Sequence, residues 1–272
     1  MASRPPVEQT DPPRSPRETL PTMYDLPSED PNEPGLPDEF HALQPQLLSA
    51  TLRLSDGDTE YFTGMDLNLY YDRQHPLWHK RPDWFLALGV PRLYDGRDLR
   101  LSYVVWQEQV SPFVVVELLS PGTEAEDLGQ RSPRPDQPPS KWKVYEQILR
   151  IPYYFLFDRY ENQFRGFRLN QERYEPLEIT ARKVWLPELE LGLGVWHGDY
   201  QGIRRDWLRW VAASDQWLPL PEELLVQERQ RADQAERQVV QIARNLAQTG
   251  MPLVEIAQLT GLAVEQLRER LN

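Results

Sequence analysis

The chain contains no cysteine among its 272 residues. Disulfide bonds and thiolate metal sites are therefore excluded, and a reducing compartment such as the cytoplasm is the expected location. The sequence also lacks a positively charged start followed by an apolar stretch, which argues against a secretory signal. No apolar run approaches the roughly 20 residues that span a bilayer. We therefore expect a cytoplasmic protein that does not have a membrane as its partner.

Positive charge is in short supply, because 30 Lys and Arg face 42 Asp and Glu, which leaves a net charge of −12. Non-specific affinity for nucleic acid comes mostly from attraction between phosphates and basic side chains. This balance argues against a general nucleic-acid coat protein, although it permits a local basic groove. A nuclease of this charge would bind nucleic acid weakly without a divalent metal ion to offset its acids.

The length allows one well-buried domain with extensions, and the composition changes along the chain in a way that predicts three parts. Residues 1–38 are rich in Pro and acids, and we expect a disordered tail there. Residues 39–215 carry the apolar segments of a folded domain. Residues 222–272 are polar and helical in pattern, and we expect a helical extension.

Apolar runs within the central part predict strands flanking a single helix, which covers 141–150. Val144, Ile148 and Leu149 form the apolar stripe of this helix, and Ser140 is its expected N-cap. The expected strands cover 47–54, 59–71, 82–90, 99–110, 113–119 and 153–158. This order predicts an α/β fold with a mixed sheet flanked by helices, in which 113–119 and 153–158 are joined by a right-handed parallel crossover.

The helical extension begins with a short heptad pattern. Leu225, Ala232, Val239 and Leu246 recur every seven residues, but Glu228 occupies a position that favours an apolar side chain. Two interpretations stay open: a coiled-coil homodimer formed through 222–248, or a solvated helix that packs on its own domain.

The end of the extension resembles a helix-turn-helix unit, with the turn at Gly261. A helix that reads DNA usually has phosphate-binding neighbours, and the second helix here mixes Glu265, Arg268, Glu269 and Arg270. We therefore favour an assembly or stabilising role for this hairpin over DNA recognition.

The most informative residue for function is Glu117, which lies inside the apolar run 113–119. An ionised carboxylate in such a place is unfavourable unless it is paired or binds a metal ion. Asp83 lies upstream, before an expected strand, and Lys141 lies downstream at the start of the expected helix. Two acids followed by a lysine is a recurring way to build a magnesium-dependent phosphodiesterase. Asp83 and Glu117 would bind Mg²⁺, with Mn²⁺ as the alternative, and Lys141 would orient the attacking water or stabilise the developing negative charge.

Each of these residues also has a purely structural interpretation. Asp83 would cap or turn the chain before a strand, Glu117 would form a salt bridge, and Lys141 would be a solvated surface side chain. Glu124, Glu126 and Asp127 follow the Glu117 strand in an expected loop. Solvated charges are the default expectation for them, and an outer-shell metal ligand among them is the alternative. The ordered combination of Asp83, Glu117 and Lys141 favours the catalytic interpretation.

The same residues carry a family resemblance that covers about 45–200. The segments are RPDWFLALGVP (81–91), SYVVWQEQVSPFVVVELLSPGT (102–123), EDLG (126–129) and KWKVYEQILRIPYYFLFD (141–158). This ordered set closely resembles the Uma family of restriction endonucleases, of the cyanobacterial type, within the PD-(D/E)XK nuclease superfamily.

The resemblance implies a restriction-endonuclease-like core in which Asp83 and Glu117 match the two metal-binding acids. The superfamily lysine normally follows the second acid by two residues, where this chain has Leu119. Members of the Uma family instead show a lysine four residues before a tyrosine on the next helix, and Lys141 with Tyr145 matches that pattern.

The sequence therefore predicts an endonuclease that hydrolyses phosphodiester bonds of DNA with Mg²⁺. A non-catalytic binding or regulatory module on the same scaffold is the alternative, which the acidic charge and Leu119 favour. A third reading is an assembly protein that acts through its helical tail.

Overall fold

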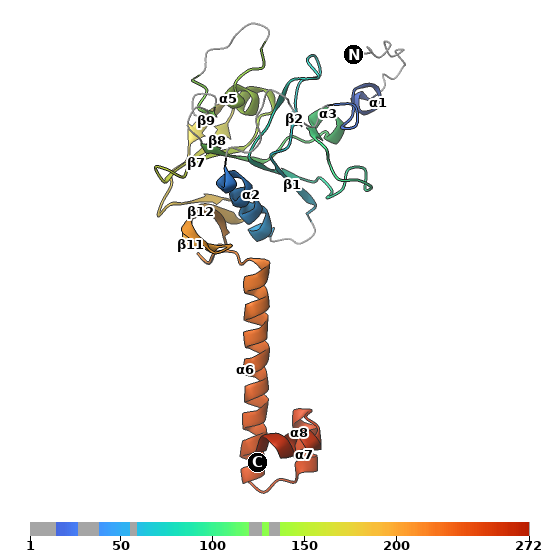
Figure 1. The fold of residues 1–272 in the computed structure, drawn as a ribbon, viewed down its shortest axis with the longest axis vertical. Helices are drawn as coiled ribbons and strands as arrows, with labels where there is room; N and C mark the ends of the chain where they lie inside the picture. The colour runs from blue at the N-terminus through green and yellow to red at the C-terminus, as the bar shows by residue number, and fades with distance from the viewer. Residues whose placement is uncertain (1–14, 27–37, 55–58, 120–126, 131–136, 272) are drawn as a thin grey trace. The chain divides into compact units, whose positions relative to one another are not determined.

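The computed structural model describes residues 15–26, 38–54, 59–119, 127–130 and 137–271 (Figure 1). It divides into two compact units, Met1–Leu218 and Pro219–Asn272.

The first unit is built on a 6-stranded sheet with strand order β1-β4-β6-β7-β8-β9. Strands β6 and β7 are parallel, and the other neighbouring pairs are antiparallel. The expected α/β fold with a mixed sheet is therefore confirmed. The bounds are β1 (Tyr61–Met65), β4 (Trp84–Leu88), β6 (Val114–Leu119), β7 (Tyr153–Asp158), β8 (Gln163–Asn170) and β9 (Arg173–Pro176).

The helix expected between the parallel strands is present as α5 (Lys141–Lys143), which continues into a π-helical turn, η1 (Val144–Ile148). Ser140 caps it, since its hydroxyl oxygen accepts a hydrogen bond from the Lys143 N–H at 3.3 Å. The Leu149 N–H bonds to the Val144 carbonyl at 2.9 Å, and both of these residues are buried. Ile148 was expected in the apolar stripe, but the wider turn leaves it 42% exposed.

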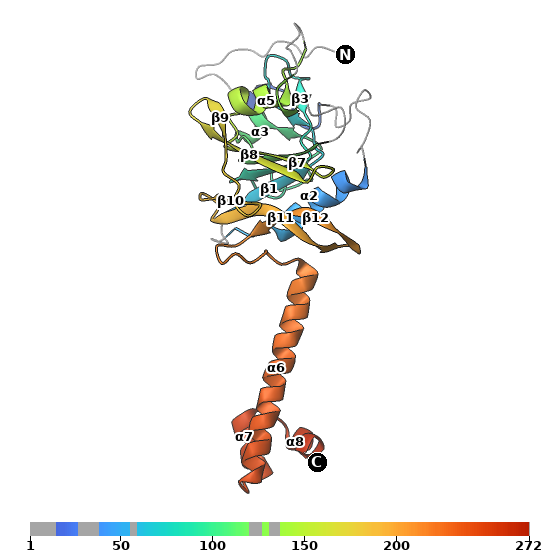
Figure 2. The same cartoon turned by 90° about the vertical axis from the view of Figure 1, so that its left-hand side faces the viewer.

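The opposite face of the sheet is covered by α2 (Glu39–Thr51), which lies between this sheet and a second one (Figure 2). The Trp84 indole N–H donates to Ser49 Oγ at 2.8 Å on one side of α2, and the Trp210 indole N–H donates to the Leu48 carbonyl at 3.0 Å on the other. The second sheet has the order β10-β11-β12, with bounds β10 (Lys183–Leu186), β11 (Leu191–Tyr200) and β12 (Ile203–Val211).

The strand expected over 47–54 is wrong, because residues 47–51 form the last turns of α2. Leu47 and Leu48 are both fully buried, since the two sheets cover the helix from opposite sides. Two-sided burial removes the apolar stripe that normally identifies a helix, and the continuous apolar run then resembles a strand.

A small sheet with the order β3-β2-β5 borders the main one. The strand expected over 99–110 is largely wrong: only Tyr103–Val104 is extended, and a short helix follows directly. These elements are β2 (Leu69–Tyr70), β3 (His79–Lys80), β5 (Tyr103–Val104) and α3 (Val105–Glu108).

Residues 15–26 differ from the expected disordered tail. This segment contains α1 (Pro16–Thr19), and Met23 is buried against a cluster that includes Trp106. The Trp106 indole N–H donates to the Pro21 carbonyl at 2.9 Å. A few apolar side chains thus hold a Pro-rich segment that composition alone would leave unfolded. The rest of the expected tail lies almost entirely outside the described residues.

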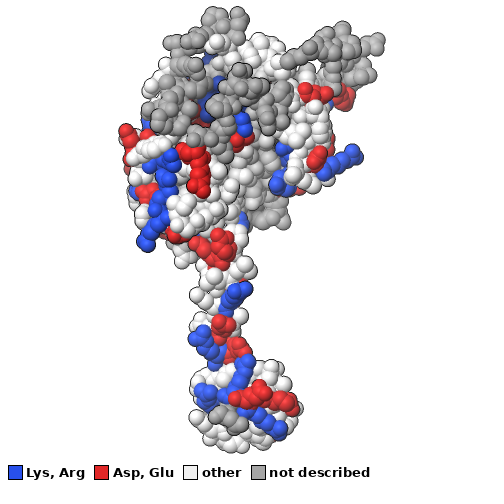
Figure 3. All heavy atoms as spheres, in the orientation of Figure 1, with Lys and Arg blue, Asp and Glu red and all other residues white. Residues whose placement is uncertain are grey.

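The second unit contains α6 (Pro221–Gln248), α7 (Leu253–Thr260) and α8 (Val264–Leu271). Its core is small and joins the end of α6 to the helical hairpin through Ala243, Ile256 and Leu267. Gly261 has φ +74° and ends α7 in the left-handed conformation that favours glycine. Side chains of both signs are interspersed over the visible face of these helices (Figure 3). None of the helices in the described ranges combines the length and apolar character needed to cross a membrane.

Candidate active site

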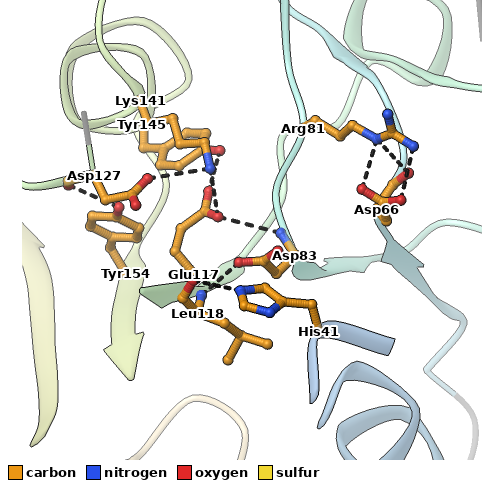
Figure 4. A network of polar contacts seen from close by, with 10 residues as sticks. All are labelled: His41, Asp66, Arg81, Asp83, Glu117, Leu118, Asp127, Lys141, Tyr145 and Tyr154. Carbon is orange, nitrogen blue, oxygen red and sulfur yellow. Dashed lines mark hydrogen bonds and ion pairs between the residues drawn. The ribbon is translucent and has the colours of Figure 1, made fainter. Parts of the chain in front are cut away.

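The candidate site lies where strands β4 and β6 part. Their pairing runs from Leu86 opposite Val114 to Trp84 opposite Val116 and then stops. Asp83 precedes Trp84 and Glu117 follows Val116, so both acids lie at the point of separation. The Asp83 carboxylate replaces the missing strand pairing, because its Oδ2 accepts the Leu118 N–H at 2.6 Å (Figure 4). A buried backbone donor needs such a partner, which ties Asp83 to the strand that carries Glu117.

Glu117 is fully buried and contacts the helix that follows it in the chain. The Lys141 ammonium lies 2.8 Å from Glu117 Oε2, and the Tyr145 hydroxyl donates to Glu117 Oε1 at 2.7 Å. The Asp83 N–H also points to Glu117 Oε2, at 3.4 Å. The structure therefore brings Asp83, Glu117 and Lys141 together, and Lys141 faces the acids and not the opposite side of the sheet (Figure 4).

Asp127 is a further member of this group. It is buried, and its Oδ1 lies 3.2 Å from the Lys141 ammonium. The Tyr154 hydroxyl donates to the Asp127 carbonyl at 3.0 Å and holds this short segment against β7. The default expectation of a solvated charge is thus wrong for Asp127, and the one cue in the sequence is its apolar neighbour Leu128, which packs against the core. Glu124 and Glu126 lie outside the described residues.

The charges of the site are out of balance within the described part of the chain. The buried carboxylates of Glu117 and Asp127 both contact the Lys141 ammonium, and the half-buried Asp83 lies beside Glu117, so three carboxylates are grouped with one ammonium. Burial raises the pKa of Glu117 to about 8, with Lys141 opposing the shift and the other two acids adding to it. Burial likewise raises the pKa of Asp83 to about 6, again against the effect of Lys141. Both carboxyl groups therefore resist ionisation until more positive charge arrives.

Lys141 behaves in the opposite way. Burial alone would lower its pKa, but Asp127, Glu117 and Asp83 together raise the pKa well above its ordinary value. The side chain is thus an ammonium at neutral pH. It donates hydrogen bonds and attracts negative charge, and it is not available as a base.

The residues fit a hard divalent cation. Carboxylate oxygens are the ligands that Mg²⁺ prefers, and a dication would neutralise the excess negative charge of the group. No set of three or more His, Asp or Glu side chains in the described ranges is arranged as a ready metal cage. Asp83 and Glu117 would therefore share the ion with water molecules, in keeping with the reluctance of Mg²⁺ to lose its hydration shell.

His41 is a residue of the site that sequence reasoning missed. It is buried near the start of α2, and its Nε2 lies 3.0 Å from the Leu118 carbonyl oxygen. Its Nδ1 lies 2.9 Å from Asp38 Oδ1, so the ring links the N-cap of α2 to the strand after Glu117. Asp83 and His41 together satisfy both backbone polar groups of Leu118. The contact joins residues 77 apart in the sequence, and no local pattern signals it.

No curated protein matches the chain, but a solved structure and a family model do. The solved structure is described as "a putative nuclease belonging to DUF820" from Anabaena variabilis ATCC 29413. It is 18% identical, with a TM-score of 0.36, and the match covers 57% of this chain and 75% of that one. The model of the Uma2 family, described as "Putative restriction endonuclease", matches residues 17–201, which include every residue of the site. The match covers more than half of the sequence, so the chain belongs to the Uma2 family.

Proposed function

We propose that this protein is a Mg²⁺-dependent endonuclease that hydrolyses phosphodiester bonds of DNA. The observation that carries the proposal is the group of buried carboxylates around Lys141 at the point where β4 and β6 part. Membership of a family described as restriction endonucleases supports a nuclease as the general activity. We place the activity in the unit 1–218, which contains the whole site.

In this proposal Asp83 and Glu117 hold the Mg²⁺ ion, and Mn²⁺ serves as an alternative cofactor at the same site. When bound, the ion polarises a phosphoryl oxygen and lowers the pKa of a water molecule. Asp83 keeps its position through the Leu118 N–H, and Glu117 keeps its position through the Tyr145 hydroxyl. Both anchors lie on buried elements, so the two acids are held in place before any ligand binds.

Lys141 acts as a hydrogen-bond donor in this proposal. Its raised pKa keeps it protonated, so it orients the attacking water or stabilises negative charge that develops on the phosphoryl group. Asp127 holds the ammonium from the other side at 3.2 Å. We therefore propose Asp127 as a positioning residue that directs Lys141 toward the acids.

The direct test is incubation of the purified chain with supercoiled plasmid DNA. We expect nicked or linear products in the presence of Mg²⁺ or Mn²⁺ and none in EDTA. Equal cleavage with and without the metal would contradict the proposed mechanism, and no cleavage under any condition would contradict the proposed function.

The second candidate is a non-catalytic module on the same scaffold. Two observations favour it: Leu119 occupies the usual lysine position, and Lys141 already forms ion pairs with Glu117 and Asp127. The two candidates differ in metal binding. Calorimetric titration with Mn²⁺ at pH 8 should show binding that is lost in Glu117→Gln, whereas a non-catalytic module would give no binding with either protein.

We also propose that the chain forms a homodimer through residues 222–248. Of the residues of α6, only Ala243 is buried, and Leu225 is 62% exposed. A helix this long is normally stabilised by packing of an apolar face, and a second copy of the heptad positions would provide that packing. A dimer would present two active sites, one for each strand of a DNA duplex.

A further inference from the structure

Two arginines from distant parts of the chain converge on the ring of Phe40, at the start of α2. Arg159 directly follows β7, and its guanidinium carbon lies 5.4 Å from the ring centroid. Arg205 belongs to β12, and its guanidinium carbon lies 4.4 Å from the same centroid. Arg159 and Arg205, called the arginine pair below, are therefore neighbours although like charges repel.

The arginine pair has too few acidic partners. Arg159 lies 2.6 Å from Asp38 Oδ2 and donates to the Tyr160 hydroxyl at 2.6 Å. The Arg205 guanidinium stacks on Phe40 and Trp207 and makes neither a hydrogen bond nor an ion pair with any residue that the structure describes. The Nε atoms of Arg205 and Arg159 are both buried, and neither has a hydrogen-bond partner among the described residues.

The nearby carboxylate of Asp206 does not supply the missing acidic partner for Arg205. Asp206 already lies 2.9 Å from Arg182 and 2.8 Å from His197. Burial lowers the pKa of Arg205, and the positive charge of Arg159 lowers it further. Among the described residues, Asp38 pairs with Arg159 but not with Arg205, so the arginine pair has one carboxylate for two guanidinium groups, in a chain whose net charge is −12. A polar group with unused donors inside a folded protein calls for an explanation, and an anionic ligand would supply one.

The arginine pair is also close to the candidate active site. Asp38 connects Arg159 to His41, which in turn contacts the carbonyl of Leu118, the residue after Glu117. In the parallel ladder, Asp158 lies opposite Leu119, so Arg159 follows the end of the strand that neighbours the Glu117 strand. Successive phosphates of a DNA strand would meet the metal-binding acids and the arginine pair in turn.

We propose that Arg159 and Arg205 bind a backbone phosphate of DNA next to the phosphodiester bond that is cleaved. This site rests on the function proposed above and adds a substrate contact to it. Guanidinium groups suit phosphate because their planar donors form paired hydrogen bonds with its oxygens. Such a contact carries no base specificity, and it positions the strand over the acids.

The test is the affinity for a short DNA duplex, measured by fluorescence anisotropy in EDTA, where no cleavage interferes. Arg205→Gln is the main variant. Since the Arg205 side chain has no polar partner among the described residues, the substitution leaves no other polar group without its partner. We expect it to weaken binding about tenfold, as for loss of a charge-assisted hydrogen bond, and to reduce the salt slope by about one. Arg205→Lys should keep the salt slope but bind more weakly than the wild type, because an ammonium cannot form the paired bonds.

Arg173→Gln is the matched control, because Arg173 is an exposed arginine of β9 and its loss changes the net charge equally. Equal effects of Arg205→Gln and Arg173→Gln would overturn the inference, since they would reflect net charge alone. Equal competition by polyglutamate and by unlabelled duplex would also overturn it, because the ligand would then be an acidic protein segment.

A parallel cleavage assay with Mg²⁺ separates this inference from the proposed function. Cleavage by the wild type combined with unchanged binding by Arg205→Gln would leave the function standing and reject the phosphate site. Selective loss of binding in Arg205→Gln without cleavage by the wild type would support the phosphate site and reject the endonuclease.

Discussion

Glu117 illustrates at the scale of a residue how a buried acid is held ready for a cation. Both of its carboxylate oxygens have donors, Lys141 on one and Tyr145 on the other. These bonds do not make ionisation easy, because burial dominates and raises the pKa to about 8. A proton and a metal ion therefore compete for the same carboxyl group.

This competition predicts an unusual dependence of stability on pH in the absence of metal. Below about pH 4 the carboxyl group is protonated in both the folded and the unfolded chain. As the pH rises toward 8, the unfolded chain loses the proton but the folded chain retains it, so folding becomes less favourable, by at most about 1.4 kcal/mol per pH unit for one proton. We expect the free energy of unfolding in EDTA to fall between pH 5 and pH 8, approximately the interval between the ordinary and the raised pKa of Glu117.

Glu117→Gln isolates the effect, because Gln does not titrate. The difference in unfolding free energy between the wild type and this variant, measured by urea denaturation, should change with pH over that interval. Titration of the histidines and of the acids with lowered pKa occurs in both proteins and cancels. Addition of Mg²⁺ should stabilise the wild type more at pH 8 than at pH 6. A pH-independent difference would show that Glu117 is ionised throughout.

Tyr145→Phe tests the anchor of Glu117. The substitution removes the hydroxyl that donates to Oε1 at 2.7 Å and leaves a buried acceptor without a partner. We expect a loss of about 1–3 kcal/mol in unfolding free energy, together with slower Mg²⁺-dependent cleavage. Tyr24→Phe, at an exposed tyrosine, is the control and should change neither quantity. Equal stability of the two variants would contradict a structural role for the Tyr145 hydroxyl.

At the scale of the elements, α6 raises the clearest question. Its heptad positions Leu225 and Ala232 are exposed in the single chain, whereas Val239 and Leu246 are half-buried, and we propose that a second chain covers the exposed ones. Leu225→Asp would place a charge in that interface. We expect a dimer for the wild type and a monomer for Leu225→Asp in sedimentation equilibrium, with the helical content reduced in the variant.

Glu228→Leu should act in the opposite direction, because it replaces the charge that interrupts the heptad pattern with an apolar side chain. It should lower the dimer dissociation constant. A wild-type chain that is monomeric at all accessible concentrations would contradict the proposed interface and favour the solvated helix.

Local patterns in the sequence predicted some elements well. The continuous apolar runs of β6 and β7 and the helix between them were identified, because each has its own composition and a recognisable cap at Ser140. Helix α2 was missed, since burial on two sides removed its stripe. The N-terminal segment was misjudged because a few anchoring side chains such as Met23 outweigh an unfavourable composition.

The site was predicted to the extent that its residues carry local signals. Asp83, Glu117 and Lys141 could be found because an acid in an apolar run is unusual and the order of motifs resembles a family. His41 could not be found, and Asp127 could not be told from its solvated neighbours, because only the folded chain reveals their burial and their contacts with Leu118 and Lys141. Contacts between residues far apart in the sequence depend on how the strands and helices assemble, and no short stretch of sequence predicts them.

For the whole molecule, the central problem is how a chain with a net charge of −12 would hold a polyanion. The proposed answer is local. A divalent ion would neutralise the negative charge of the acids at the point where the pairing of β4 and β6 ends, and the arginine pair would supply positive charge close to them. Both contributions are electrostatic, so binding and cleavage should weaken as the salt concentration rises.

The most direct test of the account is plasmid cleavage with Mg²⁺ by the wild type, Asp83→Asn and Asp215→Asn. Both substitutions remove one negative charge, but Asp215 is exposed and pairs with Lys183 on the surface, whereas Asp83 lies at the parting of the strands. We predict that Asp215→Asn cleaves like the wild type and that Asp83→Asn, although folded, loses cleavage. Undiminished cleavage by a folded Asp83→Asn would contradict the assignment of the site.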